Sequence, residues 1–129
     1  MSREAELSLL ESVVGIARGI RLPPVRLEAE VVQALGEALT AVGIAYEREV
    51  TVAPRCRVDF LVEGGVAIEV KKGKPNTKSV AAQVRRYAAG EDVTAVVLVS
   101  ERGLVYHIDE AHGKPIRYVA LSKNWGLTI

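Results

Sequence analysis

Three charged residues, Asp59, Glu69 and Lys71, lie in stretches of sequence that are otherwise mainly apolar and typical of buried β-strands. Side chains alternate between the two faces of a strand, so the run 66–71 places Glu69 and Lys71 on the same face. Asp59 stands among apolar neighbours in the preceding run, 57–62, in the same way. Two carboxylates with an amine beside them are groups that could bind a cation and act on a phosphate ester.

The turn between these two runs decides whether the two carboxylates meet. A two-residue turn at 64–65 would pair Asp59 with Val70 and place the carboxylates on opposite faces of the sheet. A three-residue turn, 63–65, pairs Asp59 directly with Glu69, and it contains glycines that accept a left-handed conformation. We predict the three-residue turn, or an equivalent bulge.

Carboxylates on adjacent strands repel each other, and a divalent cation between them removes the repulsion. Oxygen ligands without His or Cys favour Mg²⁺ or Mn²⁺ over zinc. Such a cation polarises a phosphodiester and lowers the pKa of a bound water. Lys71 would then orient the water and neutralise the developing negative charge.

Hydrophobic periodicity and turn residues predict an α/β (α+β mixed) fold, a mixed sheet flanked by helices in the order α-α-β-β-β-α-β-β-β. The second helix should direct Val31, Val32, Leu35, Ala38, Leu39 and Val42 inward. We expect one domain over 1–129, with a helical extension (1–24), a core (26–100) and C-terminal edge strands (101–129). The predicted helices are 2–18, 26–42 and 77–89, and the predicted strands are 44–52, 57–62, 66–71, 93–100, 104–108 and 117–121.

The composition of the 129-residue chain excludes several classes of protein. Apolar residues make up 49% and charged residues 26%, which excludes a wholly disordered chain. The single cysteine excludes a disulfide framework and a four-cysteine metal site within one chain. We expect no contact with a membrane because no apolar run approaches the ~20 residues of a span. Without a secretory pattern at the start, we expect a cytoplasmic location.

Charge is unevenly distributed along the chain, although the formal net charge is only +1. Residues 71–86 contain six basic residues and no acidic one. A basic strip that follows directly on a carboxylate pair favours binding to a phosphate backbone. We therefore predict nucleic acid as the partner.

The pattern Asp59-x9-Glu69-x-Lys71 on strand, turn and strand resembles the motif of the PD-(D/E)XK nuclease superfamily, with Val58 in place of the proline that the name includes. The restriction-endonuclease-like core of that superfamily runs helix, three-stranded meander, helix, strand, which is the order predicted over 26–100. That stretch is a little more than half of the chain.

Gln83 and Tyr87 resemble the QxxxY element of RecB-like nucleases, and they lie one turn apart on one face of the predicted helix. The resemblance also implies an acid on the first core helix. Glu28 is our first choice because it shares a helical face with Val32, Leu35 and Leu39, and Glu30 is the second.

The resemblance implies a role for each candidate residue. Mg²⁺ or Mn²⁺ would be held by Asp59, Glu69, the Val70 carbonyl and Glu28, with Lys71 acting on the water and Gln83 orienting the site. The residues expected to contact nucleic acid are Lys72, Lys74, Lys78, Arg85, Arg86 and Tyr87.

The sequence thus predicts a metal-dependent nuclease, with structure-selective cleavage of DNA as in small Holliday junction resolvases. One alternative is a catalytically silent nucleic-acid-binding module of the same fold in a larger complex. Another is a structural protein in which the charges form a buried ion-pair network. The stripe of Leu7, Leu10 and Val14 could either cover the sheet or form a dimer seam. Small members of the superfamily are often dimers, so a homodimer is one of the two alternatives.

Overall fold

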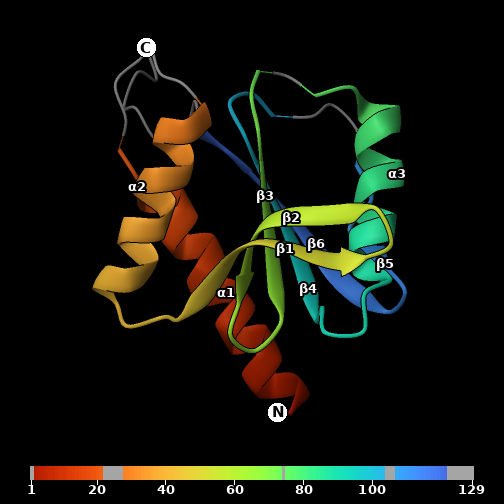
Figure 1. Ribbon diagram of the computed structural model, residues 1–129, viewed down its shortest axis with the longest axis horizontal. Coiled ribbons are helices and arrows are strands. Elements are labelled where there is room, and N and C mark those ends of the chain that lie inside the picture. Colours follow the sequence, from red (N-terminus) through yellow and green to blue (C-terminus); the bar gives the residue numbers. More distant parts are fainter. Residues whose placement is uncertain (1, 22–27, 74, 104–106, 122–129) are drawn as a thin grey trace.

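The computed structural model describes residues 2–21, 28–73, 75–103 and 107–121 (Figure 1). The elements follow the predicted order, so the α/β class with a mixed sheet is confirmed. The helices are α1 (Arg3–Gly19), α2 (Glu28–Ala41) and α3 (Thr77–Ala88), and the strands are β1 (Tyr46–Ala53), β2 (Cys56–Val62), β3 (Val66–Lys71), β4 (Ala95–Ser100), β5 (Glu110–Ala111) and β6 (Lys114–Ala120). No helix of this described part is long and apolar enough to span a membrane.

Side-chain caps begin two of the helices. The Ser2 hydroxyl accepts a hydrogen bond from the Ala5 N–H at 3.1 Å at the start of α1. The Asn76 side chain accepts one from the Ser79 N–H at 3.0 Å. The second cap fixes where α3 starts after the segment that contains the predicted phosphate-binding lysines.

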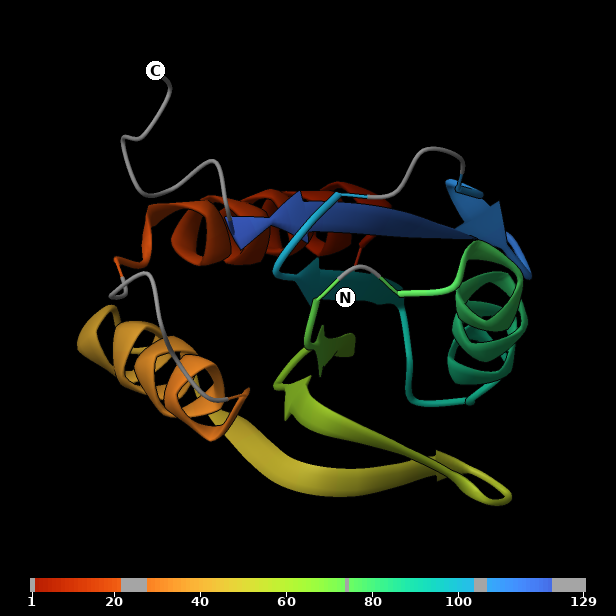
Figure 2. The same ribbon diagram turned by 90° about the horizontal axis from the view of Figure 1, so that it is seen from above.

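The six-stranded sheet has the order β1-β2-β3-β4-β6-β5. The first three strands are antiparallel neighbours, and β3, β4 and β6 are parallel. Helices α1 and α2 lie on one face and α3 on the other (Figure 2). Every residue of β4 is buried, as expected for a central strand that is covered on both faces.

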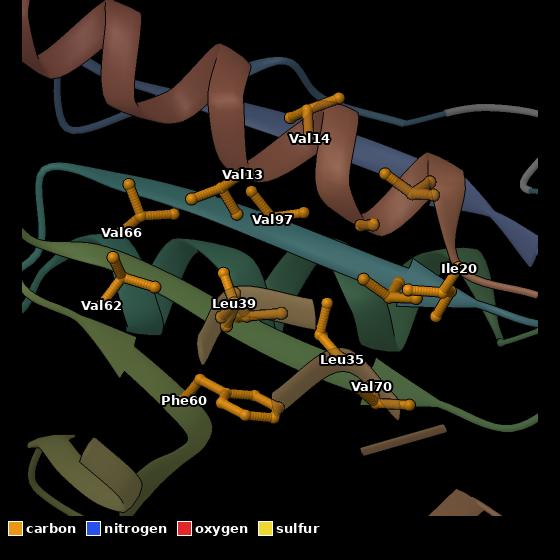
Figure 3. Close-up of a cluster of buried hydrophobic side chains, with 14 of the residues drawn as sticks. Val13, Val14, Ile20, Leu35, Leu39, Phe60, Val62, Val66, Val70 and Val97 are labelled. Carbon is orange, nitrogen blue, oxygen red and sulfur yellow. The ribbon is translucent and has the colours of Figure 1, made fainter. Parts of the chain in front are cut away.

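Two apolar clusters pack on the two faces of this sheet. Figure 3 shows the larger one, where Leu35 and Leu39 of α2 pack near Phe60 and helix α1 contributes Val13. The smaller cluster lies under α3. Strand β2 contributes to both clusters, with Phe60 and Val62 in the larger one and Cys56 and Val58 in the smaller one. The hairpin therefore crosses the front of the molecule and connects both helical layers.

The register between β2 and β3 confirms the predicted turn. Phe60 pairs with Ile68 and Leu61 with Ala67, which leaves residues 63–65 as the turn and places Asp59 opposite Glu69. The Gly65 N–H donates to the Val62 carbonyl at 2.8 Å, closing the turn.

Gly65 has no room for a side chain, so we expect Gly65→Ala to lower the free energy of unfolding by about 2–3 kcal/mol. Its φ is +105°, and a Cβ there would lie 2.8 Å from the Asp92 carbonyl oxygen. Gly43→Ala is the matched control, since Gly43 has φ +79° but nothing within 4 Å of the added atom. We expect about 1 kcal/mol for the control. Equal losses in urea titrations of both variants would show that close packing at the turn is unimportant.

Two details of the sequence prediction are wrong. Val42 was expected to face inward but is 60% exposed, because α2 ends at Ala41 and the chain turns at Gly43. The C-terminal strands are also shifted. Residues 107–108 are not in a strand, and β6 begins at Lys114 after a turn with positive φ at Gly113. Residues 104–106 of that predicted strand, and residues 26–27 of the predicted second helix, lie outside the described residues.

Candidate metal and nucleic-acid site

Asp59 and Glu69 meet where strands β2 and β3 stop pairing regularly. The paired register ends at Phe60–Ile68, and beyond it the two carboxylates connect the strands. The Asp59 N–H donates to Glu69 Oε1 at 3.0 Å, and the Val70 N–H donates to Asp59 Oδ2 at 2.8 Å. Each carboxylate thus holds the main chain of the neighbouring strand, and the pair is fixed in place.

Glu69 is the most strongly perturbed acid among the described residues. Burial, and next the Asp59 carboxylate, raise its pKa to about 7 although the Lys71 ammonium opposes the change. Lys71 Nζ lies 3.5 Å from Glu69 Oε2, and the Tyr87 hydroxyl donates to the same oxygen at 3.3 Å. One lysine does not balance two carboxylates, so the site carries excess negative charge.

These donors fit a hard divalent cation. Asp59 and Glu69 offer carboxylate oxygens, and the Val70 carbonyl follows directly in the chain. In the part of the chain that the structure describes, no group of three or more His, Cys, Asp or Glu residues could hold a metal. Mg²⁺ often needs only one or two carboxylates and takes its other ligands from water and substrate phosphate.

Glu28 shares an open groove with Asp59. The groove has a volume of about 790 Å³ between α2 and β1, and Glu28 at the start of α2 and Asp59 are both among its lining residues. Glu28 also lines a small neighbouring pocket with Val70 and Lys71. Glu30 lines neither of these two pockets.

Gln83 and Tyr87 both lie on α3, but they differ in their contacts. Tyr87 is 5% exposed, and burial followed by the Glu69 charge raises the pKa of its hydroxyl, which therefore remains a neutral donor. The structure places Tyr87 as a support for Glu69 and leaves little of its surface for nucleic acid. Gln83 Oε1 is buried and has no hydrogen-bond partner among the described residues. Such an acceptor costs about 1–3 kcal/mol unless a ligand or water satisfies it.

The basic residues of 71–86 do not form one strip. Arg86 lies beside the Cys56 thiol on β2, where burial raises the pKa of that thiol and the guanidinium opposes the rise. Burial raises the pKa of Tyr118 on β6, and the Arg85 charge opposes this larger rise. Lys72 and Lys78 are exposed, and Lys74 lies outside the described residues. Of the residues predicted to contact nucleic acid, Tyr87 is the one in the described part of the chain that hydrogen-bonds a site carboxylate.

Sequence reasoning missed Arg48. Its Nε donates to the Asp59 main-chain carbonyl at 2.9 Å, and it lines the groove beside α2. Nothing in its sequence context separates it from other strand arginines such as Arg57.

The perturbed Glu69 predicts a pH dependence of stability in chelator-containing buffer. A raised carboxyl pKa means that the folded state keeps a proton which the unfolded state releases, so stability falls as pH rises from 4.5 to about 7 and then levels off. We expect the fall to be about 2–3 kcal/mol larger than in Glu69→Gln. Denaturant titrations of both proteins from pH 4.5 to 8 measure the difference. Parallel curves would contradict the prediction.

No family model matches the sequence, and neither the search of curated proteins nor that of solved structures found a match.

Proposed function

We propose that this protein is a metal-dependent nuclease of the PD-(D/E)XK type that hydrolyses phosphodiester bonds, with DNA as the preferred substrate over RNA. The observation that carries the proposal is the fixed Asp59–Glu69 pair with the Lys71 ammonium 3.5 Å from Glu69. The order of elements and the three-residue turn support it, because the motif requires both carboxylates on one face of adjacent strands.

When bound, Mg²⁺ or Mn²⁺ would supply Lewis-acid activation of the phosphate and of a water molecule. Asp59 and Glu69, with the Val70 carbonyl, would hold the cation, and the Tyr87 hydroxyl keeps Glu69 in position. Among the described residues, Glu28 forms no three-acid group with Asp59 and Glu69, and it would support the site from the groove that it shares with Asp59. Lys71 would hold the attacking water or neutralise charge on the phosphate. By resemblance, the products would carry a 5′-phosphate and a 3′-hydroxyl.

Within this proposal the substrate is a DNA junction, flap or end, and the protein acts in the cytoplasm. A homodimer would cut two strands, but it would need a surface other than the stripe of Leu7, Leu10 and Val14, which packs on the sheet within the core. A silent nucleic-acid-binding module is the second candidate. It is favoured by the main-chain hydrogen bonds that already occupy oxygens of both carboxylates.

The test is cleavage of a labelled panel of single strand, duplex, flap, four-way junction and RNA with Mg²⁺ or Mn²⁺. Metal-dependent cutting that is lost in Glu69→Gln supports the nuclease. Salt-sensitive binding without cutting supports the silent module. Neither cutting nor binding would mean that the charged pair is structural.

A further inference from the structure

The main chain of Asp59 is held by side chains on both sides. On the β3 side, its N–H donates to Glu69. On the β1 side, residue pairing passes from Arg48–Phe60 to Val50–Val58 and skips Glu49, which has a φ of +53°. A non-glycine residue in this conformation costs about 1–2 kcal/mol, and such strain concentrates at functional sites.

The irregularity at Glu49 accompanies an unusual placement of Arg48. Besides the 2.9 Å hydrogen bond from Nε to the Asp59 carbonyl, the guanidinium carbon lies 4.8 Å from the centre of the Phe60 ring. The closest carboxylate contact is long, 4.0 Å to Glu49, and the Arg48 side chain is 42% exposed. The hydrogen bond and the ring orient the guanidinium, and the partly exposed side chain lines the groove.

From this geometry we infer that Arg48 binds one phosphate of the substrate strand, adjacent to the scissile phosphate, in the groove between α2 and β1. The inference rests on the proposed function. Arg48 is the one cationic residue among the described residues lining the groove, where the other charged residues are the acids Glu28, Glu37, Glu49 and Asp59. A strand in this groove is therefore held at one point, and an oriented guanidinium is suited to bidentate contact with phosphate.

The test combines substitution of Arg48 with single methylphosphonates, which remove the charge of one phosphate at a time. Binding of the best substrate from the panel is measured in the Glu69→Gln background with Mg²⁺, so the strand stays intact. With Arg48 present, we expect one position at which the neutral linkage weakens binding roughly tenfold, about 1.4 kcal/mol. In Arg48→Met that effect disappears, and the slope of log K against log salt decreases by about 0.7–0.9.

Two further variants separate phosphate binding from a structural role. Arg57→Met is the matched control because Arg57 is exposed on the same hairpin but does not line the groove, and it should keep the single-position effect. Arg48→Lys keeps the charge and should keep the salt slope while losing most of the position effect. If Arg48 only stabilises the β1–β2 hairpin, Arg48→Met will lower affinity for every methylphosphonate substrate by the same factor, and that result overturns the inference.

The outcomes distinguish this inference from the proposed function. If the wild-type chain cleaves but no methylphosphonate position shows a binding loss that depends on Arg48, the phosphate site is overturned and the nuclease proposal is unaffected. A position that depends on Arg48 without cleavage by the wild type supports the phosphate site and contradicts the nuclease. Absence of binding contradicts both.

Discussion

Replacing Glu69 by Gln is expected to lower the cleavage rate at least about a thousandfold while leaving the fold intact. Losing a charged metal ligand removes several kcal/mol of transition-state stabilisation, and about 4 kcal/mol corresponds to a factor of 10³. The free energy of unfolding at pH 8 should be no lower than that of wild type. The substitution removes a buried charge that burial and Asp59 both disfavour, although it also weakens the contact with Lys71.

Single-turnover cleavage and denaturant titration measure the two halves of this prediction. Asp59→Asn should behave in the same way. Glu63→Gln is the matched control, because Glu63 is an exposed glutamate in the turn that joins the two site strands. Cutting by Glu69→Gln at a rate near that of the control would place the active site elsewhere.

Replacing Lys71 by Met should lower the cleavage rate without weakening metal affinity. The ammonium partly balances the two carboxylates, so its removal leaves a more negative site that binds Mn²⁺ as tightly as before or more tightly. Cleavage should nevertheless fall about 10²–10³-fold, because a charge aimed at the developing negative charge is lost.

Calorimetric titration with Mn²⁺ and cleavage at saturating metal separate these two effects. Arg57→Met is the control, since Arg57 is an exposed cation on β2 and is not among the candidate site residues. If metal affinity and cleavage fall together in Lys71→Met, Lys71 shapes the site and does not act on the reacting groups.

The sequence was sufficient for the order of the elements and for the pairing of Asp59 with Glu69. Both follow from local patterns, namely the period of the apolar residues and a turn that contains Gly65. The placement of the basic residues could not be predicted from nearness in the chain. Arg85 and Arg86 are neighbours in the chain, but a helix rotates 100° per residue. Arg86 therefore lies beside Cys56 of β2, while Arg85 influences the pKa of Tyr118 on β6.

Arg48 was beyond prediction for a different reason. The next residue, Glu49, has a left-handed backbone conformation. Glutamate is not enriched in that conformation, so its presence in the sequence does not predict the local path of the strand. The burial of Tyr87 likewise follows from how closely α3 packs on the sheet, which the spacing of residues within one helix does not contain.

Because the Asp59 and Glu69 carboxylates connect β2 and β3, metal binding at the site should change the hydrogen bonds between these two strands. A cation would compete for the oxygen atoms that now accept the N–H groups of Asp59 and Val70. Loading the site therefore exchanges links between strands for links to the cation. The amide protons of these two residues should consequently exchange with solvent at a rate that depends on metal concentration, whatever substrate the protein acts on.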